Sequence, residues 1–189
     1  MTQTVKRTDK QTRTLNKDQA QFRAETVEGK KRLKGYAVLF ETPTVLWGEW
    51  KEVIDKKAFE GTDLSGLVLL VEHQSALLLA KAGINLKAQV DEIGLYIEAD
   101  LPNTTLANDT WELVSAGILD GMSFAFYADR WKTDSDRKID RVLHFKEVWE
   151  VTITVFPAYP QAIVIADDGN QQPETAGNAD LLTQIITAM

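Results

Sequence analysis

Cysteine is absent from this chain of 189 residues, and histidine occurs only twice, as His73 and His144. Disulfides and thiolate metal sites are therefore excluded, and any imidazole chemistry must use one of these two side chains. The sequence also lacks a run of eighteen apolar residues and an apolar N-terminal stretch of the secretory type. We expect a soluble, cytoplasmic protein with no metal and no other cofactor.

Charge and composition divide the chain into four parts. Ten Lys or Arg and four Asp or Glu fall in residues 1–34, so the remainder carries a net charge of −13 within a total of −7. Residues 1–30 lack apolar periodicity and are predicted to form a basic, flexible arm. One domain is expected over residues 31–166, followed by a linker at 167–178 and a short amphipathic helix at 179–189.

Most of the predicted domain has the pattern of β-strands. Short apolar or alternating runs are separated by Gly, Pro and Asp, and the longest are RLKGYAVLF, LSGLVLLVEH, GMSFAFYADRW and KIDRVLHFKEVWEVTITVF. DEIG, at residues 91–94, is typical of a hairpin turn. A helix capped by Asn103 or Thr104 should extend to about Ala116, and a shorter one should cover residues 55–60. The fold class predicted is mainly β with a few helices around an antiparallel, barrel-like core.

Ser123 is a candidate nucleophile because its neighbours are small. On a β-strand, Gly121, Ser123 and Ala125 share one face, and bulky apolar residues alternate with them on the other. This spacing leaves room for a carbonyl group to approach the hydroxyl. A serine that faces solvent or a helix, without chemistry, is the alternative that the local pattern alone favours.

His73 is a candidate general base, since it ends the apolar run GLVLLVEH and an imidazole can accept a hydroxyl proton near neutral pH. A surface or core histidine without chemistry is the alternative. A third residue should orient the imidazole, and His144 and Glu150 are six residues apart on one predicted strand face. Glu150 has apolar neighbours and would need a hydrogen-bonding partner if buried; a solvent-facing glutamate is equally compatible with the sequence.

Several motifs in a fixed order resemble one known family. They cover residues 33–165 and are GYAVLF, EVIDKKAF, VEHQ, EIGLYIEADL, SAGILDGMSFAF and WEVTITVFPAYPQA. Together they resemble the prohead (head maturation) proteases of tailed phages, which are related in fold to the assemblin serine proteases of herpesviruses. The resemblance implies a β core of the herpesvirus-protease type. It also implies Ser123 as nucleophile, His73 as base and Glu150 as third member, with His144 as the alternative because assemblins use a second histidine.

Two positions depart from the family pattern, and one part of the site is left to inference. Ala125 replaces the glycine that usually follows the serine by two residues, and Gln74 follows the histidine where Asp or Asn is common. Backbone N–H groups near the nucleophile are needed to stabilise an oxyanion. The turn around Ala158 and Tyr159 is the candidate for these donors, because it follows the Glu150 strand.

Three hypotheses about function follow. The first is a serine endopeptidase that cleaves scaffold, the scaffold-like part of the major capsid protein and itself, inside the procapsid in the host bacterial cytoplasm. Its partners would be those proteins and a second copy if it dimerises as assemblins do, with no membrane partner. The second is an inactive capsid-assembly or scaffold-binding module with the same core. The third is a nucleic-acid binder that uses the basic arm, and the acidic body argues against it.

Overall fold

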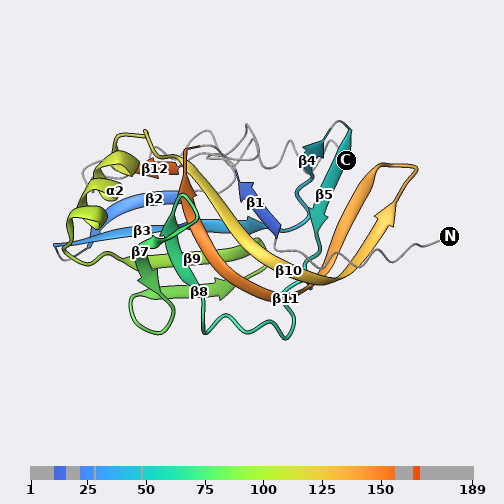
Figure 1. Cartoon of the computed structure of the whole chain (residues 1–189), viewed down its shortest axis with the longest axis horizontal. Coiled ribbons are helices and arrows are strands. Elements are labelled where there is room, and N and C mark those ends of the chain that lie inside the picture. The colour runs from blue at the N-terminus through green and yellow to red at the C-terminus, as the bar shows by residue number, and fades with distance from the viewer. Residues whose placement is uncertain (1–10, 16–21, 28, 48, 156–163, 167–189) are drawn as a thin grey trace.

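The computed structural model describes residues 11–15, 22–27, 29–47, 49–155 and 164–166. This part of the chain forms two sheets and one helix, and both sheets are curved (Figure 1). The seven-stranded sheet comprises β1 (Gln11–Leu15), β4 (Thr44–Trp47), β5 (Trp50–Ile54), β6 (Val68–Val71), β7 (Gln74–Lys81), β10 (Gly121–Asp134) and β11 (Ile139–Thr154). The five-stranded sheet comprises β2 (Phe22–Val27), β3 (Lys30–Leu39), β8 (Leu86–Val90), β9 (Gly94–Asp100) and β12 (Val164–Ala166).

The hairpin of β10 and β11 is the longest feature of the larger sheet (Figure 1). Its pairing register shifts four times between Ala125 and Trp131, and such bulges bend a strand pair and increase its twist. β5 pairs in parallel with β11 over residues 139–142, and β6 pairs in parallel with it over residues 150–153. β11 therefore has β10 along one side and two different strands along the other.

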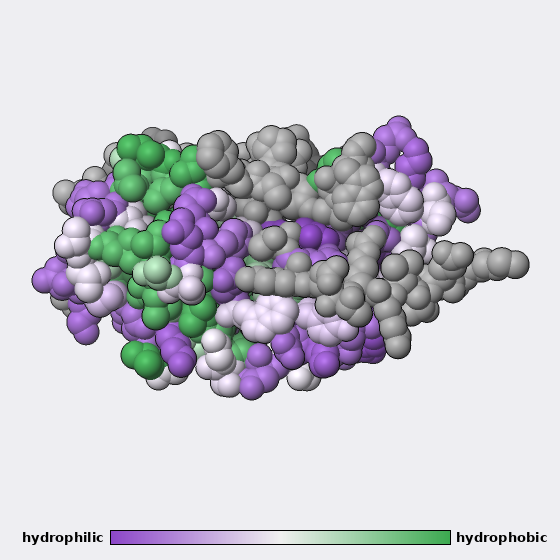
Figure 2. Space-filling view, in the orientation of Figure 1, coloured by the Kyte–Doolittle hydropathy of each residue, from purple (hydrophilic) through white to green (hydrophobic). Residues whose placement is uncertain are grey.

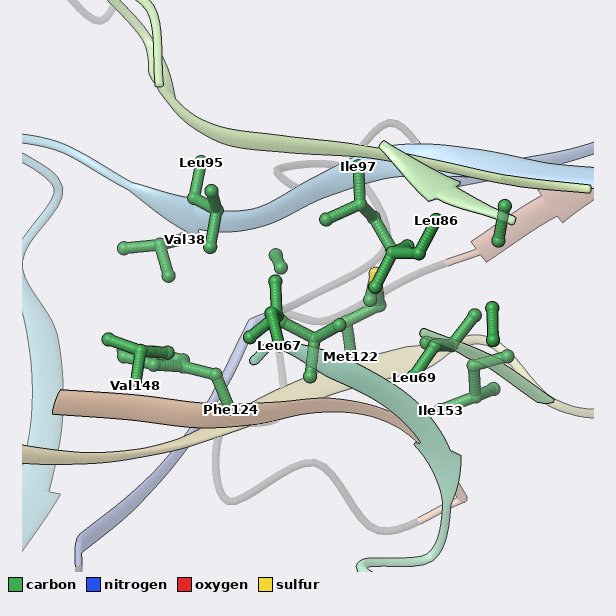
Figure 3. Close-up of a cluster of buried hydrophobic side chains, with 14 of the residues drawn as sticks. Val38, Leu67, Leu69, Leu86, Leu95, Ile97, Met122, Phe124, Val148 and Ile153 are labelled. Carbon is green, nitrogen blue, oxygen red and sulfur yellow. The ribbon is translucent and has the colours of Figure 1, made fainter. Parts of the chain in front are cut away.

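The core lies between the two sheets (Figure 3). Each of its largest side chains, once buried, stabilises the fold by about 1.5–3 kcal/mol. Those drawn from the smaller sheet are Val38, Leu86, Leu95 and Ile97, and those from the β6 and β10–β11 region are Leu67, Leu69, Met122, Phe124, Val148 and Ile153. This packing takes up one face of the first half of β10, so Ser123 and its alternate neighbours lie on the opposite face.

Two local predictions are confirmed. The DEIG segment is the turn between β8 and β9, and Asp91 Oδ1 accepts hydrogen bonds from the N–H groups of Ile93 and Gly94. A Cβ at Gly94 would stand 1.9 Å from the carbonyl oxygen of Val38, so the close approach of β3 requires glycine there. The helix is α2 (Thr105–Ser115), with Thr104 as its N-cap.

The helix expected at residues 55–60 does not form. Its backbone makes single i to i+3 turns, such as the bond from the Ala58 N–H to the Asp55 carbonyl at 2.9 Å. The carbonyl of Ala58 accepts instead from the N–H of Phe145 on β11 at 2.7 Å. Thr62 Oγ1 in turn donates to the Phe145 carbonyl. Tertiary bonds to β11 thus occupy the groups that an α-helix would use internally.

The expected barrel is also wrong in two respects. Neither sheet is closed: the larger one runs from β1 to β4 and the smaller from β12 to β8. The pairings of β11 with β5 and β6, and of β12 with β2, are parallel rather than antiparallel. The two sheets bury their apolar faces against each other, so a core forms without a closed ring of backbone hydrogen bonds.

The flexible arm predicted over residues 1–30 is wrong for residues 11–15 and 22–27, which form β1 and β2. Ala24 is fully buried, and Glu25 binds Lys34 of the neighbouring strand β3, so opposite charges pair across the ladder. β2 pairs with β3, the next strand in the chain, and the oppositely charged side chains that pair across this ladder leave no apolar periodicity. Residues 1–10, the expected linker at 167–178 and the expected helix at 179–189 lie outside the described residues.

The surface is unevenly apolar (Figure 2). Apolar side chains gather over the end of the molecule that carries α2 and β7, where Leu78, Ile84, Leu113 and Ile118 are exposed. In the part of the chain that is described, no helix is both long enough and apolar enough to cross a membrane.

Candidate active site

Ser123 lies on β10 within a block of four side chains. In the β10–β11 ladder Ser123 is opposite Thr152, and Ala125 is opposite Glu150. Residues directly opposite each other in an antiparallel pair share a face, with Cβ atoms about 4.5–5.5 Å apart. The serine, the alanine, the threonine and the glutamate therefore form one patch. The alternate residues, such as Phe124, point into the core.

His73 reaches this patch from the turn between β6 and β7. Val71 pairs with Gln74, so Glu72 and His73 form a two-residue hairpin loop. Their φ angles of 52° and 57° place both in the left-handed region, as in a type I′ turn. The N–H of His73 donates to Thr152 Oγ1 at 3.0 Å, and its Nδ1 is 2.6 Å from Glu150 Oε1. The loop thus brings the imidazole to the same two β11 residues that lie opposite Ser123 and Ala125.

The His73–Glu150 pair has the geometry of an oriented base. Glu150 is only 5% exposed, and a carboxylate removed from water needs hydrogen-bond donors. When Nδ1 carries the proton that it donates to Glu150, the lone pair of the imidazole is on Nε2. A histidine held in this way can take a proton from a hydroxyl, and the carboxylate stabilises the imidazolium that results.

Ser123 itself is 0% exposed, and its hydroxyl donates to the carbonyl oxygen of Arg13 at 2.9 Å. Arg13 belongs to β1, which pairs with β10 along this stretch. Among the described residues, Ser123 has no hydrogen bond to His73. Thr152 lies between the two, opposite the serine and bonded to the histidine N–H. Hydrogen bonds between catalytic groups often form fully only when substrate is bound.

His144 lies apart from this patch. Its Nδ1 is 2.5 Å from Asp129 Oδ1, and its backbone pairs with Arg130. Six residues of β-strand separate it from Glu150, which corresponds to about 20 Å. The structure therefore pairs His73 with Glu150 and His144 with Asp129. Ala158 and Tyr159, the expected oxyanion donors, lie outside the described residues.

Two residues that support the site were missed in the sequence. Thr152 is two residues beyond Glu150 on the same strand face, and this spacing could have indicated it. The carboxylate of Glu72 accepts from Thr154 Oγ1 at 2.8 Å and from the Val155 N–H at 2.6 Å. No pattern pointed to Glu72, because Glu–His is not a sequence typical of a type I′ turn.

Among the described residues, no group of three or more His, Cys, Asp or Glu side chains is placed to hold a metal ion. The patch instead offers a hydroxyl, an imidazole and a buried carboxylate. These are the groups of covalent acyl transfer by a serine hydrolase.

Comparison with known proteins narrows this class. The profile of the Caudovirus prohead serine protease family matches residues 18–174, which is 157 of the 189 residues. The chain therefore belongs to the Caudovirus prohead serine protease family, the proteases of phage capsid maturation. Searches of curated proteins and of solved structures gave no match. The resemblance seen in the ordered motifs is thus confirmed.

Proposed function

We propose that this protein is a serine endopeptidase that cleaves scaffold, the scaffold-like part of the major capsid protein and its own chain inside the assembling procapsid. Family membership supports the protease activity and the link to capsid maturation. The observation that carries the assignment of residues is the 2.6 Å contact between His73 and Glu150 on the sheet face of Ser123.

In the proposed reaction, Ser123 Oγ attacks the carbonyl carbon of the scissile peptide while His73 Nε2 accepts the hydroxyl proton. The tetrahedral intermediate then expels the amine, which takes that proton from His73. Water hydrolyses the acyl-enzyme in a second round in which His73 again accepts and returns a proton. Glu150 holds the ring and offsets the positive charge of the imidazolium. Backbone N–H groups around Ala158 and Tyr159 are proposed to bind the oxyanion.

A second candidate function is a capsid-assembly or scaffold-binding module that does not cleave. The complete burial of Ser123 and its bond to the Arg13 carbonyl favour this alternative, because a nucleophile must be able to meet its substrate. The contact between the half-buried His73 and the buried Glu150 favours the protease. A module without catalysis would not need a buried carboxylate whose hydrogen-bonding partner is an imidazole.

Coexpression with the capsid protein separates the two candidates. Wild type and Ser123→Ala are compared by intact-mass analysis of the capsid subunits, with Ser75→Ala, an exposed serine on β7, as the matched control. We expect shortened capsid subunits with wild type and with Ser75→Ala, and full-length subunits with Ser123→Ala. Processing by Ser123→Ala would refute the serine mechanism. No processing by wild type would favour the binding module.

A further inference from the structure

β1 lies along the open edge of the strand that carries the nucleophile. In the β1–β10 ladder Thr14 is opposite Ser123 and Arg13 is opposite Phe124, while β11 occupies the other side of β10. Addition of an extended peptide to a free sheet edge is a common mode of peptide binding, in which backbone bonds give affinity and side-chain pockets give selectivity. β1 therefore fills the position from which an extended peptide would meet Ser123.

The contact at the nucleophile involves the backbone of β1. Ser123 Oγ donates to the Arg13 carbonyl oxygen at 2.9 Å, and the serine has no exposed surface. The hydroxyl thus meets the oxygen of a peptide carbonyl, and its proton points to that oxygen instead of to His73. A strand in this position both resembles a bound substrate and prevents another from entering.

The side chain of Arg13 occupies a built subsite. Its Nε and Nη2 bind the two carboxylate oxygens of Glu52 at 2.6 and 2.7 Å, and Nη2 also donates to Gln11 Oε1 at 2.6 Å. The guanidinium carbon is 5.4 Å from the centre of the Phe126 ring, within the range of a cation–π contact. Two parallel bonds to a carboxylate together with an aromatic face suit arginine and not lysine.

Burial makes this subsite selective. Glu52 is 2% exposed, and its partner in the β5–β11 register, Asp140, is 4% exposed. A buried carboxylate is strongly destabilising without a cation, so an occupant without a positive charge at this position would bind poorly. Glu52 lies on β5, which does not pair with β1 or β10 as a neighbouring strand in the sheet. The larger sheet therefore curves enough to bring the Glu52 carboxylate close to β1 and β10.

We propose that the edge of β10 next to Ser123 binds an extended peptide with an arginine facing Phe124, that Glu52 and Phe126 form its arginine subsite, and that residues 11–15 occupy this site as an internal inhibitor. The proposal rests on the proposed role of Ser123 and adds the class of peptide that the protease accepts. Proteolysis then requires displacement of β1 by a competing arginine-containing segment.

Occupancy of the edge is tested by hydrogen exchange of residues 121–127 in the full-length chain, which needs no turnover. Arg13→Gln should exchange at least tenfold faster than wild type there, while Arg23→Gln, at an exposed position on β2, should not. Exchange over β9 serves as the check of global folding. Unchanged exchange in folded Arg13→Gln would overturn the proposal. If Arg13→Gln does not fold, Arg13→Lys keeps a cation beside Glu52 but loses the two parallel bonds, and the same result is expected.

Selectivity is tested with a fluorescent peptide of sequence KQTRTLN, which corresponds to residues 10–16, and with its arginine-to-glutamine counterpart. By fluorescence anisotropy, the arginine peptide should bind Arg13→Gln, or Arg13→Lys, at least tenfold more tightly than the counterpart. The double variant Arg13→Gln/Glu52→Gln should lose this preference. If the Arg13 single variant, which retains Glu52, binds the two peptides with equal affinity, the arginine subsite is refuted.

Capsid processing separates this inference from the proposed function. If the protein is a protease and β1 inhibits it, Arg13→Gln should cleave capsid protein faster than wild type does. If wild type cleaves capsid protein and hydrogen exchange in Arg13→Gln is unchanged, the inhibitory role of β1 is refuted and the protease function stands. If the exchange and binding results are as expected but no variant cleaves capsid protein, the protease function is refuted and the peptide-binding role of the β10 edge stands.

Discussion

Loss of the Glu72 carboxylate should misplace His73 without unfolding the protein. Both turn residues have positive φ, a conformation that costs a side-chain-bearing residue about 1–2 kcal/mol. Two backbone anchors hold the turn, from the Glu72 N–H to the Ile153 carbonyl and from the His73 N–H to Thr152 Oγ1. The Glu72 carboxylate adds a second pair, so it offsets much of the strain of the loop.

The size of the effect follows from the two bonds that Glu72→Ala removes. A hydrogen bond to a charged group contributes about 1.5–3 kcal/mol, but Val155 is 45% exposed and water can replace its bond. Thr154 is 3% exposed, so most of the loss comes from its bond to Glu72. We expect the turn to be weakened by about 2 kcal/mol, which corresponds to at most a roughly thirtyfold fall in cleavage rate.

The assay is the rate of capsid-protein cleavage by mass analysis, together with urea denaturation of each variant. Glu72→Ala should lower kcat with little change in KM, because the substrate groups are untouched. Glu72→Gln keeps one oxygen acceptor and should fall between wild type and Glu72→Ala. Glu92→Ala, in the exposed β8–β9 turn, is the control and should cleave normally. Reduced stability of Glu72→Ala with an unchanged rate per folded molecule would refute a role of this turn in placing His73.

Three further predictions concern the site and the smaller sheet. Glu150→Gln should lower the cleavage rate by about 10²–10⁴-fold while the exposed-position control Glu147→Gln does not, and full activity of Glu150→Gln would eliminate it as third member. Ala125→Val should destabilise the folded protein by about 1–3 kcal/mol in urea denaturation and reduce cleavage, because this fully buried position faces Glu150. Ala125→Gly should still cleave, and a fully active and fully stable Ala125→Val would contradict the packing argument. Burial, reinforced by the hydrogen bond to Asp91, raises the pKa of Tyr36 to about 12, above the 10.0 of an unperturbed tyrosine. The contribution of Tyr36 to the stability of the fold is therefore present below pH 10 and is lost as the pH rises towards about 12. Ultraviolet titration should show a tyrosine that ionises at high pH and that is missing in Tyr36→Phe.

Local patterns were reliable where the chain itself supplies the partners. The helix at residues 105–115 has its cap and its stop in adjacent residues, and the β8–β9 hairpin has its turn in DEIG. Residues 55–60 failed as a helix because Phe145, far along the chain, takes the carbonyl of Ala58. β1 was missed for the same reason, since it pairs with the distant strand β10. β2 pairs with β3, the next strand along the chain, but its charged cross-strand contacts leave no apolar period.

The sequence by itself determined which side chains are available for catalysis and to which family the chain belongs. Without cysteine and with two histidines, it restricted any histidine base to His73 or His144, and its ordered motifs identified the family and made Ser123 the candidate nucleophile. Only the tertiary structure paired His73 with Glu150 across 77 positions and placed His144 beside Asp129. Only it laid Arg13 against Ser123 across 110 positions. The reason is physical: the sequence specifies the type of each side chain directly, whereas register, turn conformation and burial arise only when distant strands pair.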